Sequence, residues 1–245
     1  MLLPPLTDLV ALLGIDLVLC AAVLRLLGGR HGITGWAKWA VIAFFMLLWV
    51  PFGTANLPLL AYVRGVSSDL SSTLVALACL SLGRRLFDWP AMAGREGMVL
   101  HVALAVAAVV LYPTALGWGD WDAYRPGWGS FGLLGILLLL SLACWIAGLR
   151  LLPALVGLAL LGWGAGWMES GNLWDYLMDP WLAVLAMIHC IKAGVRGCCT
   201  GTGFASWLVC LRRLDARQKQ PVLQVTHLST MSAILTMRLL TGVII

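Results

Sequence analysis

The residues whose side chains are best suited to binding or catalysis form a short acidic segment late in the chain. Asn-Leu-Trp-Asp-Tyr-Leu-Met-Asp-Pro runs from Asn172 to Pro180. Asp175 and Asp179 are four residues apart, a spacing that places two carboxylates on one face of a helix. Glu169 stands at the predicted end of the preceding helix, where a carboxylate opposes the helix dipole. Such groups can form ion pairs, bind cations or act as acids and bases.

Arg64 is the cation best placed to neutralise these acids. It stands shortly before Asp69, which begins a predicted helix. We expect Arg64 to pair with Glu169, Asp175 or Asp179, and such a pair would lock loops together without doing chemistry. The alternative is a site for a headgroup, a cation or a proton, because ionisable groups in an apolar setting are often functional.

A second candidate site is the lone acid Asp16 inside an apolar run. Ile15 and Leu17 flank it, and an uncompensated charge in the middle of a membrane helix costs at least about 3 kcal/mol. We therefore expect Asp16 to be protonated, paired or turned toward a wet cavity. Depth counting places it level with Tyr112, so a hydrogen bond to that hydroxyl is one solution. A proton-coupled or ion-coupled pathway is the other.

No cofactor or metal is expected. His101 and His189 fall at different depths of their predicted helices, which argues against a shared haem. The seven cysteines include the adjacent pair Cys198 and Cys199, with no histidine at zinc spacing. The chain contains no P-loop, no H-E-x-x-H and no G-x-S-x-G motif.

The composition identifies the class of protein. Of the 245 residues, 61% are hydrophobic and only 11% are charged, whereas a soluble domain carries about a quarter charged residues. This composition excludes an ordinary soluble enzyme, a disordered protein and a nucleic-acid binder. It predicts an all-α polytopic membrane protein.

Seven apolar segments are long enough to be candidate membrane helices, which need about 20 residues. They are 9–27, 36–53, 69–86, 97–117, 130–148, 151–168 and 175–193. The third segment is the weakest, because its clean apolar stretch runs only from Leu74 to Leu82, so a six-span arrangement stays open. An eighth span over 228–245 is not expected, because Arg238 would lie near its centre.

The basic residues give the orientation. Of the 16 Lys and Arg residues, all but Arg64 and Arg125 fall on one side of the seven-span arrangement. The positive-inside rule makes that side cytoplasmic, with the N-terminus outside and the C-terminus inside. The acids then define a candidate outer polar cluster, which consists of Arg64, Asp69, Glu169, Asn172, Asp175 and Asp179. This orientation favours a bacterial inner membrane.

The chain divides into two predicted parts. Residues 1–193 form the helical bundle. Residues 194–245 form a basic cytoplasmic tail, in which 204–214 has the spacing of an amphipathic helix lying on the membrane.

Three functions are compatible with this layout. The leading hypothesis is a non-catalytic membrane subunit or accessory protein that organises a membrane complex, with a membrane protein or a second copy as its partner. The second is a small-solute or lipid transporter with an outward-facing polar cavity. The third is a membrane enzyme acting on a lipid-linked substrate. We expect the chain to interact with the lipid bilayer and not with nucleic acid.

Overall fold

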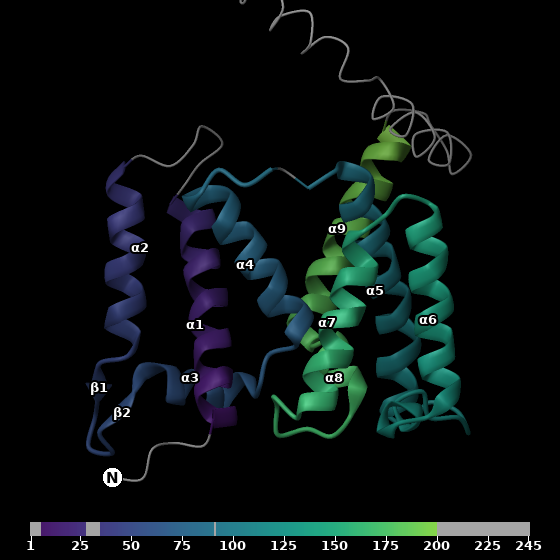
Figure 1. Ribbon diagram of the computed structural model, residues 1–245, viewed down its shortest axis with the longest axis horizontal. Coiled ribbons are helices and arrows are strands. Elements are labelled where there is room, and N and C mark those ends of the chain that lie inside the picture. The colour runs from purple at the N-terminus through teal and green to yellow at the C-terminus, as the bar shows by residue number, and fades with distance from the viewer. Residues whose placement is uncertain (1–5, 28–34, 91, 200–245) are drawn as a thin grey trace, which may run out of the picture. The chain divides into compact units, whose positions relative to one another are not determined.

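The computed structural model describes residues 6–27, 35–90 and 92–199, and side chains as far as residue 194. Met1–Ala193 form one compact unit, whose architecture is shown in Figure 1. The amphipathic helix expected at 204–214 lies outside the described residues.

The described chain is mostly helical. Its longer helices are α1 (Leu6–Leu27), α2 (Gly35–Leu48), α4 (Ser72–Leu86), α5 (Gly94–Ala115), α6 (Phe131–Ile146), α7 (Leu151–Ala165) and α9 (Pro180–Cys199). Short elements connect them: the antiparallel strands β1 (Pro51–Phe52) and β2 (Leu57–Pro58), helix α3 (Leu59–Ser67), the 3-10 turn η1 (Arg125–Trp128) and helix α8 (Leu173–Leu177).

Two of these helices, α1 and α5, are long and apolar enough to cross a membrane. Each has 22 residues, which at 1.5 Å per residue gives about 33 Å, close to the thickness of the hydrocarbon core. The helices α2, α6 and α7, and α9 as far as Gly194, are apolar but have only 10–17 residues. Helix length therefore supports membrane association through α1 and α5.

The longer helices alternate in direction along the chain, as their colours in Figure 1 show. The short connecting elements consequently lie at one end of the unit: the strands β1 and β2, the helices α3 and α8, and the turn η1. We call this end the outer end, because it contains the segments that the charge distribution assigns to the outside. The candidate polar cluster therefore comes together from loops that are far apart in sequence.

The second predicted span, 36–53, is too long. Helix α2 ends at Leu48, and the chain then forms the β1–β2 hairpin. Gly53 and Asn56 adopt positive φ values of 73° and 55° in its turn, a conformation that Gly and Asn tolerate best. Because this region is as apolar as a membrane helix, its composition did not reveal the turn after Leu48.

The seventh predicted span, 175–193, is broken. Helix α8 ends at Leu177, Met178 is extended at φ −155° and ψ 137°, and α9 begins at Pro180. Proline disfavours helical geometry in the residue before it and suits the first position of a new helix. The break places Asp179 at the start of α9, so the expected shared helical face of Asp175 and Asp179 is wrong.

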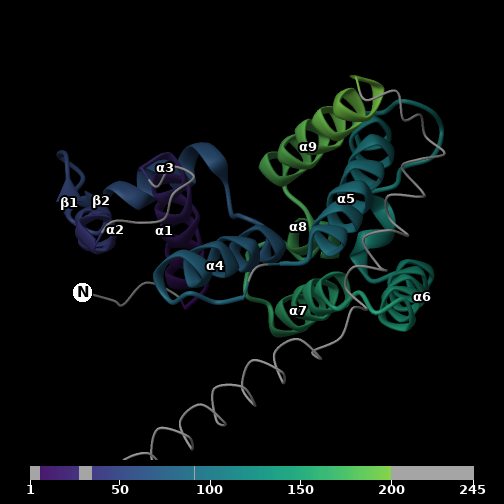
Figure 2. The same ribbon diagram turned by 90° about the horizontal axis from the view of Figure 1, so that it is seen from above.

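Helix α4 connects the two sides of the unit, because it packs against both α1 and α7 (Figure 2). One buried cluster joins residues of α4 to residues of α5–α9, and it includes the fully buried Ala159, Tyr176 and Ala186. Two smaller clusters fill the space between α1 and its neighbours α2, α3 and α4. The acidic segment 172–180 itself contributes Leu173, Tyr176, Leu177 and Met178 to this main core.

Candidate functional site

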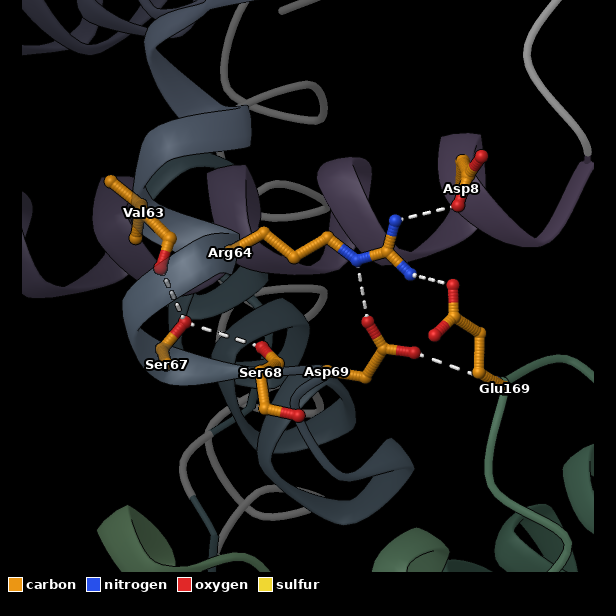
Figure 3. Close-up of polar contacts among 7 residues, drawn as sticks. All are labelled: Asp8, Val63, Arg64, Ser67, Ser68, Asp69 and Glu169. Carbon is orange, nitrogen blue, oxygen red and sulfur yellow. Dashed lines mark hydrogen bonds and ion pairs between the residues drawn. The ribbon is translucent and has the colours of Figure 1, made fainter.

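Arg64 binds three carboxylates at the outer end (Figure 3). Its Nη1 lies 2.6 Å from Asp8, its Nε 2.7 Å from Asp69 and its Nη2 2.8 Å from Glu169. The predicted pair with Glu169 is confirmed, whereas the alternatives Asp175 and Asp179 are wrong because the fork of Arg64 points toward α1 and the loop after α7. Asp8, in the first turn of α1, is a partner that the sequence did not suggest.

The Arg64 network joins four segments of the chain: α1, α3, the approach to α4 and the loop that follows α7. Three carboxylates surround one guanidinium, so the network keeps an excess of negative charge. The hydrogen bonds of Asp69 and Asp8, together with the charges of Asp69 and Glu169, raise the pKa of Arg64. The Glu169 side chain is 69% exposed whereas that of Asp69 is 13% exposed, so the Glu169 contact is the weaker one.

Glu169 does not end a helix as expected. Helix α7 stops at Ala165, and Gly166 adopts a left-handed conformation at φ 64° as its C-cap. A glycine in this position is the usual way to end a helix, because it has no Cβ to clash. Glu169 therefore lies in the following loop, where Arg64 reaches it.

Asp179 caps α9 and binds Ser71, the N-cap residue of α4. Its Oδ2 accepts hydrogen bonds from the backbone N–H of Ser71 at 3.0 Å and from the Ser71 hydroxyl at 2.8 Å. Its Oδ1 accepts the N–H of Leu182 in the first turn of α9 at 2.7 Å. Asp179 is 5% exposed, and the positive ends of α4 and α9 both favour its negative charge.

Asp175 is held by hydroxyl groups. The Tyr124 hydroxyl lies 3.0 and 2.9 Å from the two carboxylate oxygens, and the Ser170 hydroxyl makes a very short contact with one of them. Burial, followed by the hydrogen bond and charge of Asp175, raises the pKa of Tyr124 to about 12. Asp175 thus ties the η1 region to the loop after α7.

Asn172 is fully buried and braces the same loops. Its Oδ1 accepts the N–H of Trp174 at 2.9 Å, and its Nδ2 donates to the carbonyl of Tyr124 at 3.2 Å. Gly127 in η1 lies directly against it, since a Cβ there would come within 1.8 Å of the Asn172 Oδ1. Asn172 is therefore a structural member of the cluster.

A cavity of about 710 Å³ lies among these loops and opens at the outer end. Tyr112 of α5 and Tyr124 contribute to its wall. Four members of the predicted cluster line it: Asp69, Glu169, Asp175 and Asp179. The structure thus brings these four acids together around an open space. Arg64 binds two of them, and neither Arg64 nor Asn172 lines the cavity.

Asp16 does not line the outer cavity and lies instead among residues of α1 and the end of α2. It is fully buried and accepts hydrogen bonds from Trp49 Nε1 at 2.7 Å and from Cys20 Sγ at 3.4 Å. The expected bond to Tyr112 is wrong, because α1 packs against α2, α3 and α4, whereas Tyr112 lies on α5 and faces the outer cavity. Both carboxylate oxygens of Asp16 therefore accept a hydrogen bond.

His101 and His189 lie closer together than depth counting predicts. Their rings stack with centroids 4.3 Å apart and an angle of 24° between planes. Each Nδ1 lies near a carbonyl one turn earlier, that of Gly97 at 2.5 Å and that of Leu185 at 2.9 Å. The expected difference in depth is wrong, because the two rings lie side by side. Stacked rings cannot place their nitrogens on opposite sides of a haem iron.

The described residues contain no group of three or more His, Cys, Asp or Glu side chains arranged to hold a metal ion.

Sequence reasoning missed three contributors to the site: Asp8, Ser71 and Tyr124. Ser71 carried a usable signal, because a serine before an apolar helical stretch is a typical N-cap. Asp8 and Tyr124 carried none, since their roles depend on contacts between distant segments.

Comparisons with known proteins add no relative: no family model, no curated protein and no solved structure matches this chain.

Proposed function

We propose that this chain is an integral membrane protein of about seven spans, with its N-terminus outside. In this proposal it takes up a small solute or lipid in its outer cavity, as the binding step of a transporter. The observation that carries the proposal is the cavity of about 710 Å³ lined by Asp69, Glu169, Asp175 and Asp179. A space of this size falls within the range of small-molecule sites.

The hydrogen bonding of these acids favours binding over catalysis. Asp179 accepts two backbone N–H groups and one hydroxyl, and Asp69 and Glu169 are engaged by Arg64. The oxygen atoms of these carboxylates are already engaged by donors within the protein. The acids therefore supply fixed charge and shape around the cavity.

The topology is supported by helix direction and by charge. The long helices alternate in direction, and the segments predicted to lie outside share one end (Figure 1). Two of the helices have the length and composition of membrane spans. A bundle of this kind in a bacterial inner membrane would open its cavity to the periplasmic side.

Native mass spectrometry of the protein extracted gently from its own membrane tests this proposal. We expect a defined small molecule or lipid to remain bound to the wild-type protein. Tyr112→Phe and Asp175→Asn should weaken its retention, because both residues line the cavity. Asp120→Asn is the matched control, since Asp120 is an exposed loop acid outside the cavity lining.

Two results would contradict the proposal. One is a bound molecule retained equally by all variants. The other is a stoichiometric protein partner with no small molecule, which would favour the accessory-subunit hypothesis.

A further inference from the structure

A second cavity adjoins the outer one and is apolar. Its volume is about 610 Å³, and it runs between α1, α4 and α7. Its walls include Gly14, Val75, Leu80, Ala154 and Leu158. The α4 residues from Ser72 to Leu80 line it over about 12 Å of helix. We call it the α1–α4–α7 groove.

The α1–α4–α7 groove and the outer cavity meet at two residues. Asp69 and Met168 line both of them. Arg64 fixes Asp69 at this junction through a 2.7 Å contact. A molecule lying across the junction would place its polar part among the carboxylates and its apolar part along α1, α4 and α7.

The charge of the outer cavity restricts the polar part. Four carboxylates line it, and its described lining contains no Lys or Arg. The cation Arg64 binds Asp69 and Glu169, but it is shared with Asp8 and does not line the cavity. A phosphate or sulfate in this cavity would meet an excess of like charge, whereas an ammonium group would find opposite charge.

We propose that the occupant is an amphiphile with a protonated amine at its head, whose alkyl chain lies in the α1–α4–α7 groove and whose amine lies in the outer cavity. This inference rests on the proposed function and names its ligand class. Gly14 supports the arrangement, because its lack of a side chain lets Val75 of α4 approach α1, and an added Cβ would lie 3.0 Å from that side chain. The apolar groove and the acidic cavity together fit the two ends of one molecule.

Photolabelling with two alkyl ammonium probes tests the proposal on the full-length protein in phosphatidylcholine nanodiscs. One dodecylammonium probe carries a diazirine next to the amine, and the other carries it at the end of the chain. We expect the first to label peptides that contain Tyr112, Met168 and Met178, and the second to label peptides from 72–80 and 151–158. A dodecyl sulfate probe with the same terminal diazirine is the charge control and should leave the groove unlabelled.

Matched variants separate the groove from general contact with lipid. Ala154→Trp fills the groove from α7, whereas Ala143→Trp adds the same side chain to α6 outside it; both alanines are exposed. We expect Ala154→Trp to lose chain-end labelling in 72–80 while amine-end labelling of the cavity persists, and Ala143→Trp to keep both. Persistent cavity labelling also shows that the variant is folded, and Leu158→Trp repeats the test if Ala154→Trp fails to fold.

The outcomes distinguish this inference from the proposed function. If the amine-end probe labels the cavity but Ala154→Trp and Leu158→Trp leave chain-end labelling unchanged, the groove assignment is overturned while the cavity remains a binding site. If the ammonium and sulfate probes label the groove equally, the amine assignment is overturned. If neither ammonium probe labels the cavity and no molecule is co-extracted, both the amine-amphiphile inference and the proposed function are contradicted.

Discussion

Asp179 accepts hydrogen bonds from both the backbone and the side chain of Ser71, at 3.0 and 2.8 Å, across 108 residues of sequence. The same carboxylate accepts the N–H of Leu182. Ser71 is the N-cap of α4, and Asp179 immediately precedes α9. One buried acid therefore fixes the start of two helices and the floor of the outer cavity.

Replacing Asp179 by alanine should strongly destabilise the protein. The substitution leaves the two N–H groups and the Ser71 hydroxyl without their acceptor, and each buried unsatisfied group costs about 1–3 kcal/mol. We expect a loss of at least about 3 kcal/mol in the free energy of unfolding, measured by thermal unfolding in detergent. Asp120→Ala is the control and should change little. A stability close to wild type in Asp179→Ala would show that the two helix starts do not depend on this carboxylate.

Arg64 should be irreplaceable even by lysine. Its three nitrogens contact three different carboxylates, and a lysine ammonium cannot reproduce this fork. We expect Arg64→Lys and Arg64→Gln to lose about 1–3 kcal/mol of stability and to expose the loop after α7 to proteolysis. Arg125→Gln, at an exposed position, is the matched control. If Arg64→Lys is as stable as the wild type, a single ion pair at this position is sufficient to hold the outer loops together.

The sequence predicts the long helices and their order well, because apolar segments separated by polar turns are visible without a structure. Its errors lie where short-range chemistry ends a helix. Gly166 ends α7, and Pro180 begins a new helix after a break that composition alone does not reveal. The hairpin after Leu48 is apolar enough to resemble a span.

The site could be predicted only in part. The scarcity of outer cations correctly linked Arg64 to Glu169. Depth counting failed for Asp16 and Tyr112, because equal depth does not tell which helices are neighbours. Tyr124 and Asp175 meet only after η1 and the loop after α7 fold against each other, a long-range contact that no local pattern encodes.

Asp16→Asn should be tolerated. An asparagine Oδ1 can still accept the hydrogen bond of Trp49 Nε1, and Asp16 does not line the outer cavity. We expect a stability change below about 1 kcal/mol and unchanged retention of the bound molecule. Asp16→Leu leaves the Trp49 donor without its partner and should cost about 1–3 kcal/mol. Loss of ligand retention in a well-folded Asp16→Asn protein would instead indicate an ion or proton pathway through this residue.

Alkaline pH should open the outer loops through Tyr124. Its folded-state pKa is raised to about 12 from the usual tyrosine value of 10.0, so the folded state holds this proton more tightly than the unfolded state. The resulting stability is fully present below pH 10 and is lost as pH rises through about 12. Phenolate absorbance of wild type minus Tyr124→Phe should show one titration near pH 12, and a difference curve centred on pH 10 would contradict the contact with Asp175.

Gly127→Ala should be far more damaging than a glycine substitution in a helix. A Cβ at Gly127 would lie 1.8 Å from Asn172 Oδ1 and 2.6 Å from Trp174 Cδ1, and Asn172 is fully buried with its hydrogen bonds made to Tyr124 and Trp174. We expect displacement of Asn172, loss of those bonds and destabilisation of about 3 kcal/mol or more. Gly135→Ala on α6 has open space around it and should be neutral or stabilising, because alanine favours a helix over glycine by about 1 kcal/mol. Thermal unfolding of the two variants, measured side by side, tests this prediction. Equal stability would show that the loops around Asn172 can move apart. The outer cavity would then lack the rigid wall on which ligand binding depends.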